Sequence, residues 1–383
     1  MTRRTTSILA AAFAALVAVQ AGAVRHVGLE TDAFNRVYPA SFRNSFVFSP
    51  VSFELDCVLI AESLDTIPKA NVASMMGVVI DLPSAYRPVI EALEAETNGL
   101  SCISARGFCV PDIRAADANF RTSVQREYGA EVMRLHPKAG AEAWFKAMLE
   151  GEMEEFEISV AESVSDRCSF YDLVSVRAAW AEPFPPENTS IRPFRVDASS
   201  NTVDVAFMSD VRVADTLEMD CYTILALPLK GGSWFFAMLP KNGYTLPDIR
   251  IFFNSLEIDG ILSILSPGSP VPAIRCPCAI EIPRIELYSR TSFAGALRYF
   301  RVPTTGLRGA AGNAPCGEFV QFAKFSIAEG GRGETPNGDK NLAGAPPALA
   351  AAKQLAFDRP FLFFVYHPAT ATILMAGQFT GAK

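Results

Sequence analysis

The chain has 383 residues, of which 50% are hydrophobic and 28 are Phe, so it can build a large core, and disorder over most of its length is excluded. Its formal net charge is −7, and Lys and Arg are scattered, so there is no electrostatic footprint for nucleic acid or for an anionic membrane. No Ser/Gly linker or charge block divides the middle of the chain, and we therefore predict one large domain.

The N-terminus has the three parts of a secretory signal peptide. Arg3 and Arg4 form a basic start, 8–19 is an apolar run, and 21–23 supplies small residues at a cleavage site. The apolar run is short for crossing a bilayer. We predict a signal peptide at 1–23 and a protein that is secreted and extracellular, or periplasmic in a bacterial host. The alternative is an N-terminal core helix.

The mature domain is expected to span 24–383 without a membrane anchor. No Cys follows the first apolar run until Cys57, which argues against a lipid-anchored form, and no later segment has a transmembrane pattern. The first third alternates helical patterns with one short buried strand. Residues 29–38 predict an amphipathic helix, and the apolar run 44–50 predicts the strand. Pro50, which closes that run, suits the first turn of a following helix.

A further helix is predicted at 139–156, which is rich in helix formers. From Leu173 onward the pattern changes to strands. Residues 201–213 alternate apolar and polar side chains, and 221–240 contains two apolar strands around a Gly-Gly turn, which predicts a hairpin. Two further stretches read as strands, at 279–287 and 360–379. Helices followed by mostly antiparallel strands predict an α+β domain.

Metal-site and catalytic motifs are scarce. Eight Cys allow disulfides in an exported protein, but their spacing does not fix the pairing. Cys276-Pro277-Cys278 is one residue short of a zinc knuckle and the chain has only three His, so we expect no metal. No nucleophile elbow, dinucleotide fingerprint or P-loop occurs, so we expect no cofactor and no enzyme, although a hydrolase with paired carboxylates needs no signature and stays open.

Several blocks resemble the serpin family of serine protease inhibitors. In the block 44–53, Phe48, Ser49, Pro50 and Ser52 match a Phe-Ser-Pro step and a following Ser that lie under the family's central sheet. The other blocks occur in the family's order, at 128–132, 178–196, 225–240, 282–297 and 357–379. The resemblance implies a single large domain, monomeric, with helices packed on a central, mostly antiparallel sheet, plus smaller sheets and an exposed reactive-centre loop.

The loop is placed at about 329–354. This segment is rich in Gly, Pro, Asn and charge, which predicts an exposed loop, and long loops usually carry function. The resemblance makes it bait for a serine or cysteine endopeptidase; in inhibitory members the cut loop inserts into the central sheet and distorts the attached protease. The candidate bait bonds are Ala345-Pro346 and Leu349-Ala350.

The hinge of this loop departs from the inhibitory pattern. Glu329 and Gly331 match the family's acidic and Gly positions, but Arg332 stands where an inward-facing Thr or Ser is expected, and a buried unpaired cation costs several kcal/mol. Glu334 follows on the same face, where it repeats the problem or pairs with Arg332. Pro336 would remove a ladder hydrogen bond from a central strand. The hinge therefore favours a binding, carrier or structural role over a working inhibitor, which stays the alternative.

The region beneath the sheet departs too. Where the family usually has an Asn and a His that control sheet opening, this chain has Asp172 and Gln321. Together with Ser49, Pro50 and Ser52, they form the predicted sheet-opening region, in which Asp172 and Gln321 could provide a substitute hydrogen-bond network.

Overall fold

The computed structural model describes residues 26–38, 43–78, 81–94, 100–134, 143–144, 147, 167–196, 201–265, 274–330 and 352–381. The predicted signal peptide lies outside the described residues, as do nearly all of the helix predicted at 139–156 and the loop from 331 to 351. No helix among the described residues is long and apolar enough to cross a membrane.

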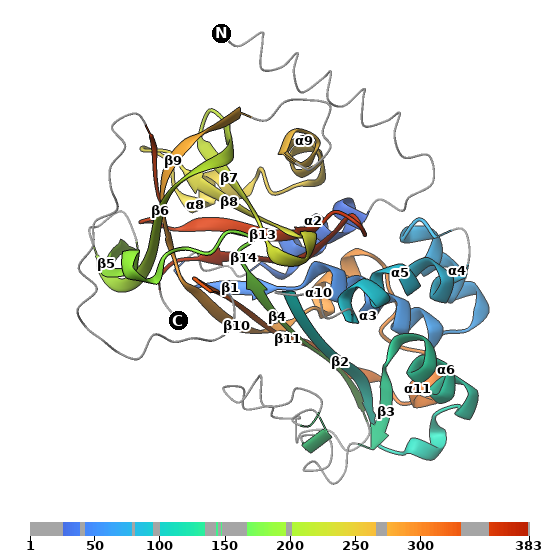
Figure 1. The fold of residues 1–383 in the computed structure, drawn as a ribbon. Coiled ribbons are helices and arrows are strands. Elements are labelled where there is room, and N and C mark those ends of the chain that lie inside the picture. The colour runs from blue at the N-terminus through green and yellow to red at the C-terminus, as the bar shows by residue number, and fades with distance from the viewer. Residues whose placement is uncertain are drawn as a thin grey trace.

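Helices gather at one end of the molecule and on the faces of two sheets (Figure 1). They are α2 (His26–Val37), α3 (Pro50–Glu62), α4 (Thr66–Met75), α5 (Leu82–Glu94), α6 (Ala118–Tyr128), α8 (Leu246–Arg250), α9 (Ser255–Leu265), α10 (Ala294–Tyr299) and α11 (Arg308–Ala311). Short 3-10 turns lie at Ile113–Ala115, Pro186–Asn188 and Lys230–Gly232.

One of the two sheets has five strands among the described residues, in the order β10-β11-β4-β2-β3. Their bounds are β2 (Leu100–Val110), β3 (Glu131–Arg134), β4 (Cys168–Ala179), β10 (Ile285–Ser292) and β11 (Cys316–Ala328). The sheet is mixed: β10/β11 and β2/β4 are antiparallel, whereas β11/β4 and β2/β3 are parallel.

In the described part of the chain, the second sheet has nine strands, ordered β1-β14-β13-β8-β7-β6-β9-β12, with β5 paired to β6. The strands are β1 (Phe46–Phe48), β5 (Ser190–Arg195), β6 (Thr202–Glu218), β7 (Tyr222–Pro228), β8 (Trp234–Pro240), β9 (Ile274–Pro283), β12 (Lys353–Ala356), β13 (Phe361–His367) and β14 (Thr372–Phe379). All its pairings are antiparallel except β12/β9. The predicted α+β class is confirmed.

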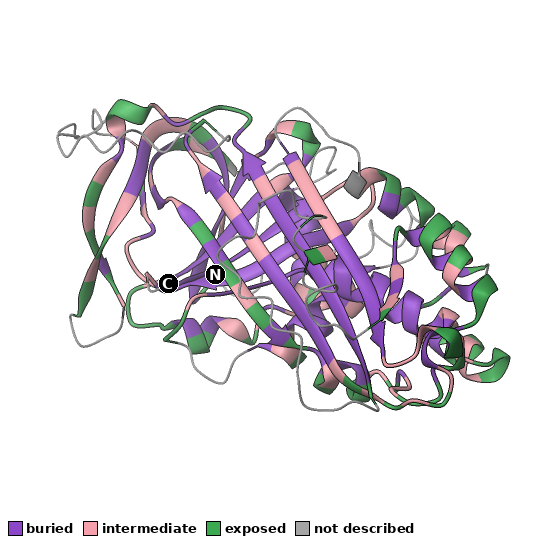
Figure 2. Cartoon of the chain, turned by 90° about the horizontal axis from the view of Figure 1, so that it is seen from below, coloured by how far each residue is buried: buried purple, intermediate pink, exposed green. Residues whose placement is uncertain are grey.

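The two sheets pack face to face through aromatic side chains. Phe325 of β11 stacks against Phe235 of β8 and Phe363 of β13, with ring centroids 6.5 Å and 5.3 Å apart. Such aromatic contacts add to the burial of apolar area that holds the layers together. Figure 2 shows strands that are buried along most of their length, whereas the outer helices keep exposed faces.

Helix α3 lies inside this core because its sequence suits that position. Ser49 is its N-cap, and its hydroxyl accepts a hydrogen bond from Ser52 N at 3.3 Å, while Pro50 occupies the first turn. Twelve of its residues, from Pro50 to Ala61, are buried. The predicted start of this helix is confirmed, and the helix carries the acids Glu54 and Asp56 into the interior.

Two predictions need correction. The first third contains more than one short strand, because 100–110 forms the long strand β2, whose second half is buried on both faces and so lacks the two-residue alternation of a half-buried strand. The stretch 279–287 crosses from one sheet to the other: β9 ends at Pro283 and β10 begins at Ile285. Polar residues (Glu281, Arg284 and Glu286) recur among the apolar ones through this stretch, and such local alternation does not reveal a change of sheet.

Candidate functional site

The candidate site is the seam between β4 and β11. These parallel strands pair directly from Cys168/Cys316 at one end to Ala179/Ala328 at the other, and no strand lies between them. An additional central strand of this sheet would have to separate them along this ladder. Resistance to separation therefore comes from the ladder and from any side chains that join the two strands.

Two side chains join the strands midway along the seam. Gln321 of β11 lies opposite Asp172 of β4, and its Nε2 donates to Asp172 Oδ2 at 2.8 Å. Gln321 also binds the chain at the start of α3: its Oε1 accepts from Ser49 N at 2.7 Å, and its Nε2 donates to Ser49 O at 3.1 Å. Ser52 Oγ donates to Asp172 Oδ1 at 2.9 Å. All four side chains are buried, so each bond is shielded from water.

Ser49, Ser52, Asp172 and Gln321, predicted from four separate places in the sequence, are thus brought together by the fold. Ser49 Oγ extends the network by donating to Leu374 O of β14 at 2.7 Å. Pro50 makes no side-chain hydrogen bond and contributes by starting α3.

Two charged residues that the sequence analysis missed complete this cluster. Arg106 of β2 donates from Nη2 to Ser52 Oγ at 2.9 Å, and its Nε lies 3.6 Å from Asp172 Oδ1 and 3.7 Å from Asp56 Oδ1. All three charged groups are buried. A cation inside the strand "CISARGFCV" and an acid inside the apolar helix "SFELDCVLIA" were signals for them, because charged residues are almost never fully buried unless they are paired.

Burial dominates the acid–base behaviour of this cluster. It raises the pKa of Asp56 well above its ordinary value, and the neighbouring Asp172 raises it further, while Arg106 lowers it. The pKa of Asp172 is also raised by burial, against lowering by Arg106 and by the bonds from Ser52 and Gln321. One guanidinium thus faces two carboxyl groups, and Asp56 is the group that more readily takes up a proton.

The end of the seam toward the loop is fixed by Glu329. Its carboxylate accepts from Arg284 Nε at 2.7 and 2.8 Å and from the hydroxyl of Thr189, and the side chain is buried. Arg284 lies between β9 and β10, so this contact ties the first hinge residue to both sheets. Thr189 and Arg284 lie within the blocks 178–196 and 282–297 that resemble the family, but nothing in those blocks marks them as partners of Glu329.

The remaining predicted loop residues lie outside the described part of the chain. They are Gly331, Arg332, Glu334 and Pro336 of the hinge and both candidate bait bonds, Ala345-Pro346 and Leu349-Ala350. The described chain resumes at Ala352 and enters β12, which pairs with β9. The two ends of the undescribed segment are therefore attached to different sheets.

The cysteine pair that suggested a metal lies on β9. Cys276 Sγ and Cys278 Sγ are 3.5 Å apart, and burial raises the pKa of Cys278 to about 12, which disfavours the thiolate that a metal requires. Among the described residues, no group of three or more His, Cys, Asp or Glu side chains could hold a metal ion.

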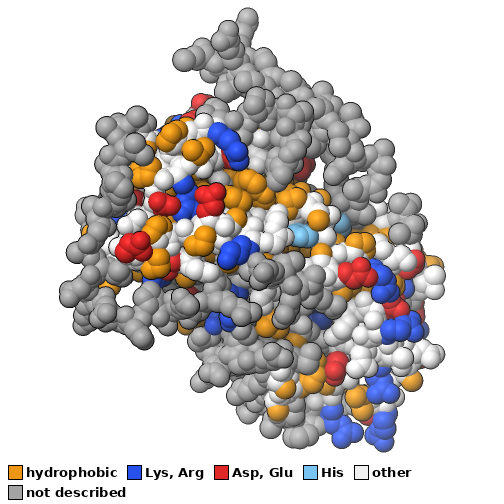
Figure 3. Space-filling model, in the orientation of Figure 1, with side chains coloured by type: hydrophobic (Ala, Val, Ile, Leu, Met, Phe, Trp, Pro, Cys, Tyr) orange, Lys and Arg blue, Asp and Glu red, His pale blue; other side chains and the backbone are white. Residues whose placement is uncertain are grey.

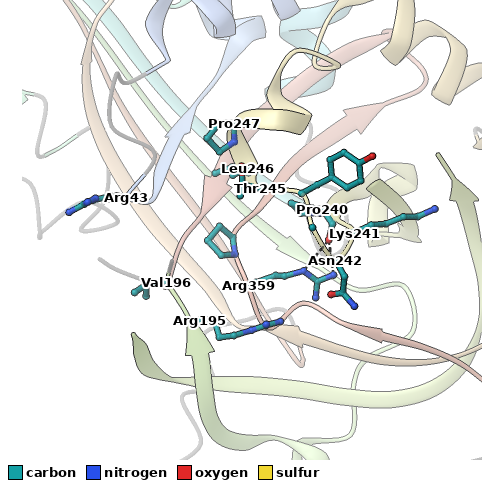
Figure 4. A pocket seen from close by; sticks show the side chains of 13 residues that line it. Arg43, Arg195, Val196, Pro240, Lys241, Asn242, Thr245, Leu246, Pro247 and Arg359 are labelled. Atoms are coloured by element: carbon teal, nitrogen blue, oxygen red, sulfur yellow. Dashed lines mark hydrogen bonds between the residues drawn. The ribbon is translucent and has the colours of Figure 1, made fainter. Parts of the chain in front are cut away.

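A pocket of about 340 Å³ lies near the end of β8 (Figure 4). Residues that line it include Arg195, Pro240, Leu246, Pro247, Arg359 and Pro360. Two of its guanidinium groups already have partners: Arg359 donates to Pro240 O at 3.0 Å and to Asp358 at 2.9 Å, and Arg195 donates to Asp358 at 3.1 Å. These contacts join neighbouring segments of the chain, so the two guanidinium groups have a structural role at this pocket.

The surface shows no large area of one charge on the face seen in Figure 3, where Lys and Arg are interspersed with Asp and Glu. This agrees with the scattered charges of the sequence. The seam and the predicted hinge therefore remain the candidate site.

Comparisons with known proteins match this chain to one protein family and to its fold. The family model described as "Serpin (serine protease inhibitor)" matches residues 28–381. Human glia-derived nexin is 22% identical over 368 residues, covering 90% of this chain and 89% of the relative. Native protease nexin-1 with heparin has a TM-score of 0.78 at 19% identity, covering 93% of this chain and 98% of that one. Human thyroxine-binding globulin complexed with thyroxine has a TM-score of 0.76 at 16% identity, covering 94% of this chain and 99% of that one.

Proposed function

The chain belongs to the serpin family, and on that premise we propose that it is a secreted, non-enzymatic serpin that displays residues 331–351 as an exposed loop and acts by binding, with its central sheet kept closed. The observation that supports this proposal is the buried cluster of Gln321, Asp172 and Arg106, which joins the β4/β11 seam and which insertion of a loop with Arg332 and Pro336 in its hinge would have to break.

Insertion of the loop into this seam has two free-energy costs: bonds between β4 and β11 must break, and unfavourable loop residues must enter the sheet. Separating the strands breaks the bond from Gln321 to Asp172 and leaves a buried carboxylate with one partner fewer, at about 1–3 kcal/mol or more for a charged group. A strand formed by the loop would then bring Arg332 inward and place Pro336 in a central position, where Pro cannot donate to the ladder. Sequence and site thus oppose insertion together. Thyroxine-binding globulin, a fold neighbour, illustrates a binding role on this fold.

The alternative is an active inhibitor of a serine or cysteine endopeptidase that acts as a suicide substrate. The family's description as serine protease inhibitors and the acidic hinge residue Glu329 favour it. On this reading the closed seam is the form that precedes cleavage, and the energy released when the loop enters the sheet drives inhibition.

A thermal melt before and after a single protease nick within 331–351 separates the two functions. We expect the melting temperature to stay unchanged, because a loop that does not insert adds no strand. A large rise on nicking would overturn the proposal and would call for a search for protease complexes that survive denaturing gels. The control is the double variant Arg332→Thr, Pro336→Ala, melted like the parent protein in the presence of reductant, which should gain stability only after nicking and so shows that the melt detects insertion.

A further inference from the structure

Two cysteines face each other at the base of the seam. Cys168 begins β4, Cys316 begins β11, and they are direct partners in the parallel ladder. Cys168 N also donates to Pro315 O at 2.9 Å, which holds the two strand ends together. Both side chains pack against the same apolar cluster, with Cys168 fully buried and Cys316 half-buried. The even number of cysteines did not reveal this pairing, because 148 positions separate the two residues in the sequence.

The position suits a disulfide. Neighbouring strands lie about 4.8 Å apart, and a disulfide needs Cα atoms about 4.4–6.8 Å apart. Cys109 of β2 is near, but it lies opposite Ser169 and packs in a cluster on the other face of the sheet with Tyr171. Among the described residues, Cys316 is therefore the natural partner of Cys168.

We propose that Cys168 and Cys316 form a disulfide under oxidising conditions, and that this bond ties the base of β4 to the base of β11. The oxidant is a low-molecular-weight disulfide of the glutathione class. One protein thiolate attacks it and releases one thiol; the second protein thiolate then attacks the mixed disulfide and releases the other. The protein loses two protons and two electrons, and the small disulfide is reduced to two thiols.

Access decides the order of these steps. Cys316 is half-buried and Cys168 is fully buried, so the Cys316 thiolate attacks the small disulfide first, and the Cys168 thiolate then attacks the mixed disulfide and closes the bond. Burial also raises the pKa of the Cys316 thiol, which makes exchange slow in the folded protein. The bond therefore forms fastest during folding, before the base of the sheet closes.

The disulfide would limit how far the sheet can open. A strand placed between β4 and β11 moves their Cα atoms to about 9.6 Å, twice the strand spacing, which is beyond the reach of a disulfide. The seam could then open only as a wedge, starting at Ala179 and Ala328 and stopping above Cys168 and Cys316. Full insertion of the loop would require reduction of this bond, whatever the hinge residues allow.

Peptide mapping tests the bond directly. The protein is unfolded with reductant, refolded in a buffer of oxidised and reduced glutathione, alkylated, and digested without reduction. We expect one cross-linked peptide pair that contains Cys168 and Cys316. Separate alkylation of the two thiols under oxidising conditions, or a bond from either one to another cysteine, would overturn the proposal.

Denaturation tests what the bond does. A disulfide that closes so long a chain segment should change the unfolding equilibrium constant by about a thousandfold, so reductant should lower the urea midpoint. The drop should persist in Cys276→Ser, which removes the other close thiol pair, and should be absent in Cys316→Ser. If the cross-link has formed but reductant does not change the urea midpoint, the disulfide does not stabilise the closed seam and this part of the proposal is refuted.

The same variants separate this inference from the proposed function. The change in melting temperature when Cys316→Ser is nicked depends on the hinge alone, because this variant lacks the disulfide at the base of the seam. An unchanged melting temperature there supports the binding role whether or not the disulfide exists. If nicking raised the melting temperature of Cys316→Ser but not that of the oxidised wild-type protein, the binding role would be refuted, and the disulfide would be supported as a restraint on opening of the sheet.

Discussion

Replacing Arg106 by Met should destabilise the protein strongly at neutral pH. Arg106 lies 3.6 Å from Asp172 and 3.7 Å from Asp56, and all three are buried. Met keeps most of the aliphatic volume, so the change removes the charge and its bond to Ser52 without opening a large cavity. Removing one partner of a buried ion pair costs about 3–5 kcal/mol, a large share of the 5–15 kcal/mol that a typical domain has.

The loss should depend on pH in a defined direction. Burial already raises the pKa of Asp56 and Asp172 above the unfolded value of 3.8, and loss of Arg106 removes an influence that lowers both. The folded state then holds protons that the unfolded state releases, so stability falls as pH rises from the unfolded pKa through the folded one. The penalty of Arg106→Met is therefore largest at neutral pH and shrinks toward about pH 4.

Urea denaturation at about pH 7.5 and about pH 5 measures this difference. In the matched control, Asp56→Asn and Asp172→Asn are added to Arg106→Met, which removes the unpaired charges and should recover much of the loss. The reasoning would be refuted if Arg106→Met cost less than about 1 kcal/mol at the higher pH, or if the cost were the same at both.

Two further substitutions test the hinge and the sheet packing. Glu329→Gln removes the charge that Arg284 binds, so it should lower the free energy of unfolding by about 2 kcal/mol and speed protease cleavage of the predicted loop that follows. Arg284→Gln should lower it by the same amount. If the losses of the two variants added up in the double variant, a direct pair would be contradicted. Gly377→Ala would put a methyl group 2.7 Å from the Phe363 ring and should lower the free energy of unfolding, measured by heat or urea, by about 3 kcal/mol. The control Gly330→Ala, whose new methyl group would have no atom within 4 Å, should leave stability unchanged. Equal effects of the two substitutions would refute the steric argument.

Elements with strong local patterns could be predicted from the sequence. The hairpin β7–β8, the start of α3 at Pro50 and the final pair β13–β14 each depend on turn or cap residues that act on their neighbours in the chain. Strand β2 was missed because its pattern is weak, and the boundary between β9 and β10 was missed because apolar and polar residues alternate on both sides of it. Local signals do not say which sheet a strand joins.

The candidate site was predictable only in part. Family resemblance selected Ser49, Ser52, Asp172 and Gln321 as residues to examine, but it did not supply the guanidinium of Arg106 that lies beside them. Burial of a charge is a property of the assembled core, and a sequence can signal it only by placing a charge in an apolar run. The same holds for the partners of a hinge residue, which come from distant strands.

The sequence by itself determined the family, the α+β class, the residue types of the predicted loop hinge and the absence of the catalytic motifs searched for, because these depend on residue types and their order. Only the tertiary structure decided that Gln321 lies opposite Asp172 and that Cys168 lies opposite Cys316. The register of two parallel strands so far apart in the chain is set by the packing of their side chains against the core, and no local spacing encodes it.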